Sequence, residues 1–115
     1  MEMKELGLKG EQLAADYLKK EGCIILFRNY KTPYGEVDII VKDNDTVVFV
    51  EVKTRTNTSF GHPFEAVDFK KQERLKRIAL FYIKSINRQP KVRFDIISIC
   101  YEEGKYQIEH IKEAF

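Results

Sequence analysis

Residues 46–54 read Thr-Val-Val-Phe-Val-Glu-Val-Lys-Thr, and this stretch decides the fold. Its β-branched and aromatic residues favour a strand, and apolar side chains occupy both of the alternating faces. A strand that is apolar on both faces is typical of the centre of a sheet with helices on each side. The same stretch holds Glu51 and Lys53, two charged residues that a buried strand ordinarily excludes.

The residues on either side of this strand predict an α/β protein. Residues 36–42 form a second strand, which a polar turn at residues 43–45 joins to the first. The remaining segments are a helix at 4–21, a strand at 23–30, a long helix from 64 or 65 to 86, a strand at 92–100 and a last strand at 106–111. The order α-β-β-β-α-β-β favours one mixed sheet with helices packed on it.

Length and composition limit the possible functions. The 115 residues fit a single domain spanning residues 1–115. The formal net charge is only +2, so a surface that binds nucleic acid must be a local basic patch. No apolar run approaches the roughly 18 residues of a membrane span, and the charged N-terminus lacks the core of a signal peptide. We therefore expect a soluble, cytoplasmic protein that makes no membrane contact.

The predicted hairpin brings two carboxylates together. If residues 44–45 form a two-residue loop, Asp38 lies opposite Glu51. Glu36 then lies opposite Lys53. Opposing Cβ atoms are about 4.5–5.5 Å apart, so the two acids repel each other and resist burial. Either Lys53 or a bound divalent metal must compensate, and a one-residue change of register would turn Asp38 to the other face.

Two carboxylates beside a lysine suit phosphodiester hydrolysis. Carboxylate oxygens bind Mg²⁺ or Mn²⁺, which keep coordination positions for water and for a phosphate oxygen. Such a metal polarises the phosphate and activates water. Lys53 can position that water or neutralise charge on phosphorus. The alternative for Asp38, Glu51 and Lys53 is a salt-bridged patch on a half-exposed sheet face, although the apolar neighbours of Glu51 argue against solvated surface.

Residues 35–40 (GEVDII) and 49–55 (FVEVKTR) resemble the acid…(D/E)-x-K signature of the PD-(D/E)XK nuclease superfamily. Nearly the whole chain resembles the YraN-like family of uncharacterised bacterial proteins, which are described as similar to archaeal Holliday-junction resolvases. Further matching features are Gly10-Glu11 with Ala14 and Leu18, Arg28-Asn29, Phe60-Gly61, Arg93-Phe94-Asp95 and Ala114-Phe115. The strict Pro-Asp pair of the superfamily is absent, since Val37 precedes Asp38, but the ligating carboxylate is retained.

This resemblance implies a PD-(D/E)XK nuclease-like αβββαβ core and a Mg²⁺- or Mn²⁺-dependent endonuclease that acts on branched DNA. It implies catalysis by Asp38, Glu51 and Lys53. The implied metal ligands are Asp38, Glu51, the peptide carbonyl of Val52, and Glu11 on the first helix. The alternative for Glu11 is an ordinary acid in the first turn of a helix, where the helix dipole favours it. A resolvase cuts two strands, so we expect a symmetric homodimer.

Basic residues predict where nucleic acid binds. Lys70, Arg74 and Arg77 follow an i, i+4, i+7 spacing, a stripe that can track a phosphate backbone. A solvated helix face balanced by neighbouring acids is the alternative. Arg55 follows the catalytic strand directly and is a further phosphate-binding residue, and the loop from Arg55 to Pro63 is expected to lie across the site.

Several questions stay open at the level of sequence. Asp95 is either an orienting partner of Arg93 or a polar residue at a strand edge. A nucleic-acid-binding module that keeps the nuclease fold without cleaving competes with the endonuclease. A protein-interaction domain is a third interpretation, but it leaves the paired carboxylates unexplained. The sequence distinguishes neither DNA from RNA nor a junction from a flap.

Overall fold

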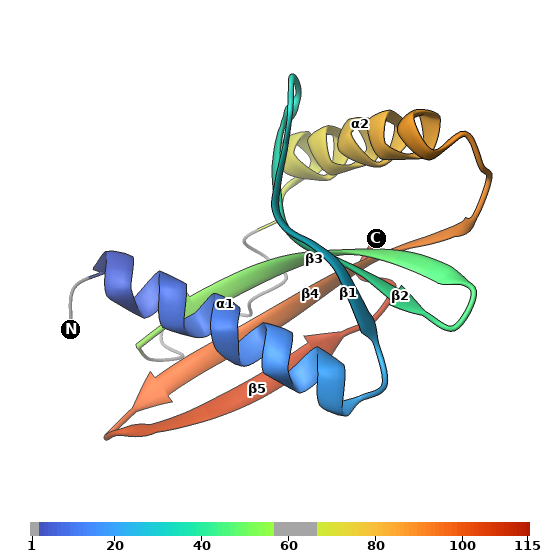
Figure 1. Ribbon diagram of the computed structural model, residues 1–115. Helices are drawn as coiled ribbons and strands as arrows, with labels where there is room; N and C mark the ends of the chain where they lie inside the picture. The colour runs from blue at the N-terminus through green and yellow to red at the C-terminus, as the bar shows by residue number, and fades with distance from the viewer. Residues whose placement is uncertain (1–2, 57–66) are drawn as a thin grey trace.

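The structure is a computed structural model that describes residues 3–56 and 67–115. The elements are α1 (Met3–Lys20), β1 (Ile24–Thr32), β2 (Gly35–Asp43), β3 (Thr46–Arg55), α2 (Phe69–Ile86), β4 (Lys91–Glu102) and β5 (Lys105–Ile111). Their order is the predicted one: a helix, three strands, a helix and two strands (Figure 1). Neither of the two described helices is long and apolar enough to cross a membrane.

The strands form one mixed five-stranded sheet in the order β1-β2-β3-β4-β5. β3 pairs in parallel with β4, and the other neighbours are antiparallel. A parallel pair requires a long crossover, which here contains α2. The apolar half of β3, residues 47–50, is buried on both faces, which confirms the central position predicted for this strand.

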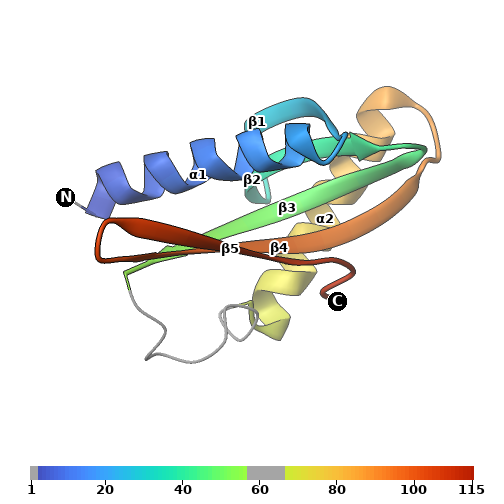
Figure 2. The same cartoon turned by 90° about the horizontal axis from the view of Figure 1, so that it is seen from below.

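The two helices cover opposite faces of the sheet, as Figures 1 and 2 show. On one face, α1 buries Ala14, Ala15 and Leu18 against side chains of β2, β3 and β4. On the other face, α2 packs Leu75, Ile78, Ala79 and Tyr82 against a second apolar cluster that includes Phe49. β3 contributes to both clusters, so its position is fixed from both sides.

α2 begins at Phe69, later than the predicted start at residue 64 or 65. Asp68 has an extended backbone, and its side chain accepts a hydrogen bond from the amide of Lys71 at 2.8 Å, which makes it the N-cap. Val67 lies within the predicted helix and is buried, but it precedes α2 and is not part of the helix's apolar face. Residues 64–66 lie outside the described part of the chain.

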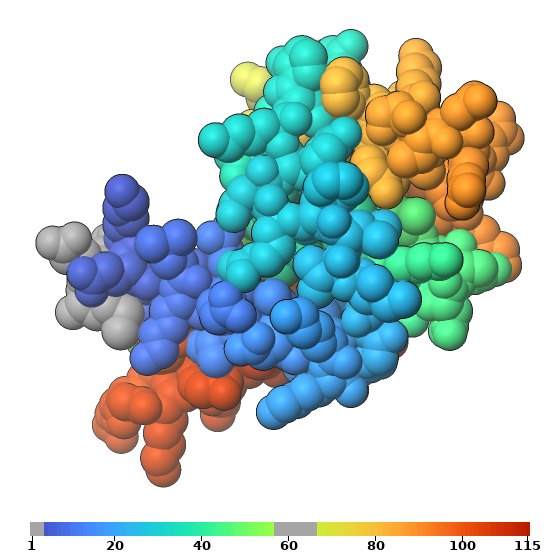
Figure 3. Space-filling view, in the orientation of Figure 1, coloured from blue at the N-terminus to red at the C-terminus, as the bar shows by residue number. Residues whose placement is uncertain are grey.

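The tip of the β1–β2 hairpin leaves the sheet and leans over α2. Pairing between β2 and β3 stops at Ile39, whereas pairing between β1 and β2 continues to Thr32 and Gly35. Within the described part of the chain, residues 30–37 therefore pair only with each other and with no third strand, and they form a two-stranded ribbon, called the β1–β2 ribbon below. It stands out from the surface beside α2 (Figure 3). The ring of Tyr34 at its tip meets that of Phe81 edge-on at 6.4 Å.

Candidate catalytic site

The β2–β3 hairpin has the predicted register over its first part. Paired residues run from Asp43 with Thr46 to Ile39 with Val50, as a two-residue loop requires. The ladder then stops, because the Asp38 carboxylate accepts the hydrogen bond of the Val52 amide at 2.8 Å. In a continued ladder that amide would donate to the carbonyl of the residue preceding Asp38.

This interruption corrects part of the predicted geometry. Val37 packs with Ile40 on the α2 side of the sheet, while Ile39 packs on the α1 side. Strict alternation would place Val37 and Ile39 on one face, so the strand twists at Asp38. The expectation that Glu36 lies opposite Lys53 was wrong, because the ladder between β2 and β3 ends at Ile39 and Val50 and reaches neither residue.

One cavity of about 420 Å³ collects the predicted residues. Glu11, Asp38, Glu51, Val52 and Lys53 all line it. Lys4, Leu6, Gly7 and Leu8, in the first turns of α1, supply further lining. The sequence-predicted set therefore meets in space, although it comes from a helix and two strands.

Glu11 is held at this cavity by two neighbours. It lies beyond the first turn of α1, so the alternative of an ordinary first-turn acid does not apply. Gly10 allows α1 to approach β3, because a Cβ atom there would overlap the side chain of Thr54. Asn29 has a left-handed backbone with φ 52°, and its side-chain amide, when turned so that the nitrogen faces the two carboxylates, donates to Glu36 Oε1 at 3.1 Å and to Glu11 Oε1 at 3.2 Å.

The acids of the cavity lie close enough to affect each other. Burial, followed by the charge of Glu51, raises the pKa of Asp38 to about 7. The Glu11 carboxylate raises this pKa further, and the Val52 amide and Lys71 partly offset the rise. Glu51 is itself only 8% exposed. The carboxylates therefore form a cluster of mutually repelling negative charges, and a bound cation would offset this repulsion.

Lys71 is a site residue that the sequence reasoning missed. Its Nζ lies 3.2 Å from Glu51 Oε1, closer than Lys53 Nζ at 3.8 Å. Burial and the neighbouring Lys71 lower the pKa of Lys53. Burial alone would lower the pKa of Lys71 too, but its contacts with Lys53 and Glu51 outweigh burial and raise it. This contact depends on how α2 docks against the sheet, so no local signal in the sequence would have found it.

The donor atoms suit a hard divalent cation. Asp38, Glu51 and the Val52 carbonyl offer oxygen ligands only, and Mg²⁺ is usually held by one or two carboxylates together with water and phosphate. Within residues 3–56 and 67–115, no three His, Cys, Asp or Glu side chains stand close enough together to hold a metal. A cation at Glu51 would compete with Lys71 for the same oxygen.

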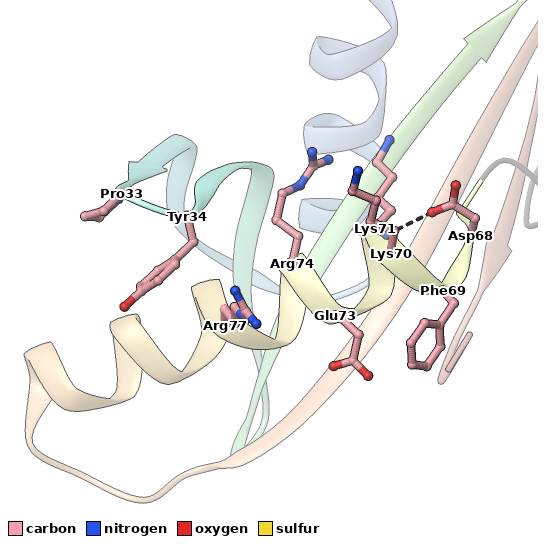
Figure 4. A pocket seen from close by; sticks show the side chains of 9 residues that line it. All are labelled: Pro33, Tyr34, Asp68, Phe69, Lys70, Lys71, Glu73, Arg74 and Arg77. Atoms are coloured by element: carbon pink, nitrogen blue, oxygen red, sulfur yellow. Dashed lines mark hydrogen bonds between the residues drawn. The ribbon is translucent and has the colours of Figure 1, made fainter.

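The predicted basic stripe is exposed and lines a second, larger cavity. Lys70, Arg74 and Arg77 lie on α2 beneath the tip of the β1–β2 ribbon, around a space of about 860 Å³ (Figure 4). Arg55 is half-buried at the end of β3, two residues after Lys53. Of the loop expected to cross the site, residues 57–63 lie outside the described part of the chain.

Asp95 belongs to a buried polar network and not to a strand edge. It is 1% exposed and forms two hydrogen bonds with Arg93, at 2.9 and 3.0 Å. His110 lies 2.7 Å away, and the Glu113 amide donates at 3.2 Å. Burial alone would raise the pKa of Asp95, but these hydrogen bonds hold it below the usual range. Asp95 thus orients Arg93, as one of the two predicted alternatives proposed.

Comparisons with known proteins agree on one family. The family model described as "Uncharacterised protein family UPF0102" matches residues 10–99. A UPF0102 protein of Syntrophomonas wolfei is 52% identical over 113 residues, covering 97% of this chain and 98% of the relative. A UPF0102 protein of Thermodesulfovibrio yellowstonii is 47% identical over 111 residues, covering 96% of each. One from Dictyoglomus thermophilum is 54% identical over 107 residues, covering 90% and 89%.

Proposed function

This chain belongs to the UPF0102 family, and we propose that it is a Mg²⁺- or Mn²⁺-dependent endonuclease of the PD-(D/E)XK type that acts on branched DNA. Membership agrees with the predicted resemblance to YraN-like proteins. The family description names no activity, so the proposal rests on the site. One observation carries it: Asp38, Glu51, Lys53 and Glu11 line one cavity.

The order of elements supports the nuclease assignment. The first six elements, α1 to β4, follow the αβββαβ order of the PD-(D/E)XK core, and β5 adds an edge strand. The acid and the (D/E)-x-K motif occupy the ends of β2 and β3 where the two strands separate. Strand separation leaves room for ligand atoms between Asp38 and Glu51.

Each residue of the cavity has a role in this proposal. Asp38, Glu51 and the Val52 carbonyl hold the cation, and Glu11 completes the negative surroundings of the site. When bound, the cation supplies Lewis-acid polarisation of the phosphate and neutralises charge. Lys53 orients the attacking water or stabilises the charge that develops on the phosphoryl oxygens.

The buried acids favour an enzyme over a binding module that does not cleave. Carboxylates repel phosphates, so a module that only binds DNA gains nothing from three acids in one cavity. The raised pKa of Asp38 means that its ionised form weakens the metal-free fold. A catalytic cation explains why these carboxylates lie together although their ionised forms lower the stability of the metal-free fold.

The proposal is tested by separating chemistry from affinity. Glu51→Gln removes a ligand charge and Lys53→Ala removes the ammonium group. Each should lower Mg²⁺-dependent cleavage of branched DNA by about 100-fold or more, the scale of losing one electrostatic stabiliser. Junction affinity measured in Ca²⁺ should change by less than about tenfold. Asp16→Asn and Lys20→Ala, exposed residues of α1, serve as matched controls.

The substrates are four-way junction, flap, duplex and single-stranded DNA, each with Mg²⁺ or Mn²⁺. A wild-type protein that binds junctions but cuts none of these substrates is a binding module, and the enzyme proposal is then wrong. A protein that neither binds nor cuts any of them refutes the proposal for DNA and makes RNA the next substrate class. Light scattering measures the homodimer that cutting two strands requires.

A further inference from the structure

A groove runs along α2 beneath the tip of the β1–β2 ribbon, as Figure 4 shows. Its volume is about 860 Å³. Pro33 and Tyr34 of the ribbon form one side, and the N-cap of α2 with residues of its first turns forms the other: Asp68, Phe69, Lys70, Lys71, Glu73, Arg74 and Arg77. A smaller hollow of about 380 Å³ continues it toward the end of α2 and shares Tyr34 and Arg77 with it.

The groove is positively charged along its length. Lys70, Arg74, Arg77 and Lys84 line the two hollows at i, i+4, i+7 and i+14, a row about 21 Å long on an α-helix. Among the described residues, none of these four forms an ion pair. Two acids, Asp68 and Glu73, also line the groove, against four basic residues, Lys70, Lys71, Arg74 and Arg77, so its net charge stays positive. The Asp68 carboxylate accepts a hydrogen bond as the N-cap of α2, and Glu73 lies between Lys70 at i−3 and Arg77 at i+4.

Aromatic rings accompany the basic row. Tyr34 is 50% exposed, and Phe69 at the other end of the groove is 72% exposed. The Thr32 hydroxyl accepts the Tyr34 amide at 3.1 Å and donates to the Gly35 carbonyl at 2.9 Å, so the turn that carries Tyr34 is braced. Phe81 meets the Tyr34 ring edge-on, which fixes the ring over α2.

Exposed rings beside a phosphate-binding row distinguish unpaired from paired strands. Bases of a duplex stack on each other and leave no free face, whereas unpaired bases stack on aromatic side chains. The groove lies beside the candidate catalytic cavity, because Lys71 lines the groove and its Nζ lies 3.2 Å from Glu51 Oε1. A strand in the groove therefore lies close to the candidate catalytic residues.

We propose that this groove binds an unpaired nucleic-acid strand, with a base stacked on Tyr34 and the phosphates along the basic row of α2. The inference deepens the proposed function, because it names the unpaired arm of a branched substrate as the part that this surface recognises. It requires no metal and no cleavage, so it can fail or succeed independently of the catalytic site.

The test measures binding in EDTA by fluorescence anisotropy. The probes are labelled oligo(dT), oligo(U) of equal length and a duplex. Tyr34→Ala should weaken binding of the unpaired strands by about fivefold or more, the lower end for loss of one stacked base. Tyr34→Phe keeps the ring and should bind within about twofold of wild type. Tyr106→Ala is the matched control, since Tyr106 is 49% exposed beside the β4–β5 turn.

Arg77→Ala in the same assay should lower the magnitude of the slope of the logarithm of the binding constant against the logarithm of salt concentration by about one, the value for one lost phosphate contact. The inference is overturned if the wild type does not bind either unpaired strand, or if Tyr34→Ala weakens duplex and single strands equally. It is also overturned if Tyr34→Ala and Tyr106→Ala have the same effect. If any of these results is found and the protein still cleaves DNA, the proposed metal site is retained and the substrate must bind at another surface.

Discussion

Replacing Asp38 by Asn should change how stability depends on pH. The Asp38 pKa is raised to about 7 in the folded protein, above the value of about 3.9 for an unfolded chain. The folded state therefore binds the proton more tightly, and stability falls as pH rises from about 4 to above 7. Asn keeps an oxygen that can accept the hydrogen bond from the Val52 amide, but it cannot ionise.

The magnitude follows from the two pKa values. Ionisation of Asp38 costs the metal-free protein about 1.5 kcal/mol at pH 5 and about 4 kcal/mol at pH 8. Asp38→Asn should therefore be the more stable protein in EDTA, and its advantage should grow by about 2.5 kcal/mol between these two pH values. Titrating groups outside the cavity are common to both proteins and cancel in the difference, whereas Glu51 and Glu11 interact with Asp38 directly.

Urea denaturation in EDTA at pH 5 and pH 8 measures this difference. Asp16→Asn, which changes an exposed acid of α1, should show no such pH-dependent gain. In a second arm, Mn²⁺ should raise the melting temperature of the wild type but not that of Asp38→Asn. An Asp38→Asn variant that is strongly destabilised at neutral pH without metal would show that Asp38 is a structural ion-pair partner, and the metal site would lose its basis.

Two further predictions concern packing and the buried network. Gly10→Ala should destabilise the protein by about 1–3 kcal/mol in urea denaturation, because the new methyl group would lie 3.0 Å from Thr54 Cβ. Gly7→Ala, whose added Cβ meets nothing within 4 Å, should be neutral or stabilising, and equal losses at both glycines would refute the close approach of α1 to β3. Asp95→Asn should cost about 1.5–3 kcal/mol at neutral pH, since it removes one of the two carboxylates, Asp95 and Asp43, that pair with the partly buried Arg93. Because the pKa of Asp95 is lowered, this difference should disappear only in acid below the usual carboxylate range, and its absence at pH 7 would refute the orienting role.

Much of the fold could be predicted because the chain signals it locally. The apolar run of β3 indicated a central strand, and the two-residue loop at residues 44–45 set the register of the hairpin correctly as far as Ile39. Periodicity identified the buried face of α1. The start of α2 was predicted too early because the buried Val67 fits the apolar period of the helix, although Asp68 caps the helix after it.

The sequence predicted which residues belong to the site, but it did not predict how they are arranged in space. Alternation along a strand assumes an unbroken ladder, and Asp38 breaks the ladder with its own side chain. The contact of Lys71 with Glu51 depends on how the crossover helix docks, which no local pattern specifies. The same is true of Asn29, whose left-handed backbone lets its amide reach Glu11.

The connectivity of the sheet has a consequence for the order of folding. The β2–β3 hairpin closes over two residues, so its contacts carry a small loop entropy, whereas β3 and β4 pair only after a long crossover. The hairpin brings Asp38 toward Glu51 before α2 can deliver Lys71. We therefore expect the acids to meet early in folding with Lys53 but without Lys71, so that repulsion between them is only partly offset and slows the first contacts. Mild acid or a divalent cation should then accelerate refolding, and the candidate site would limit the rate of its own assembly.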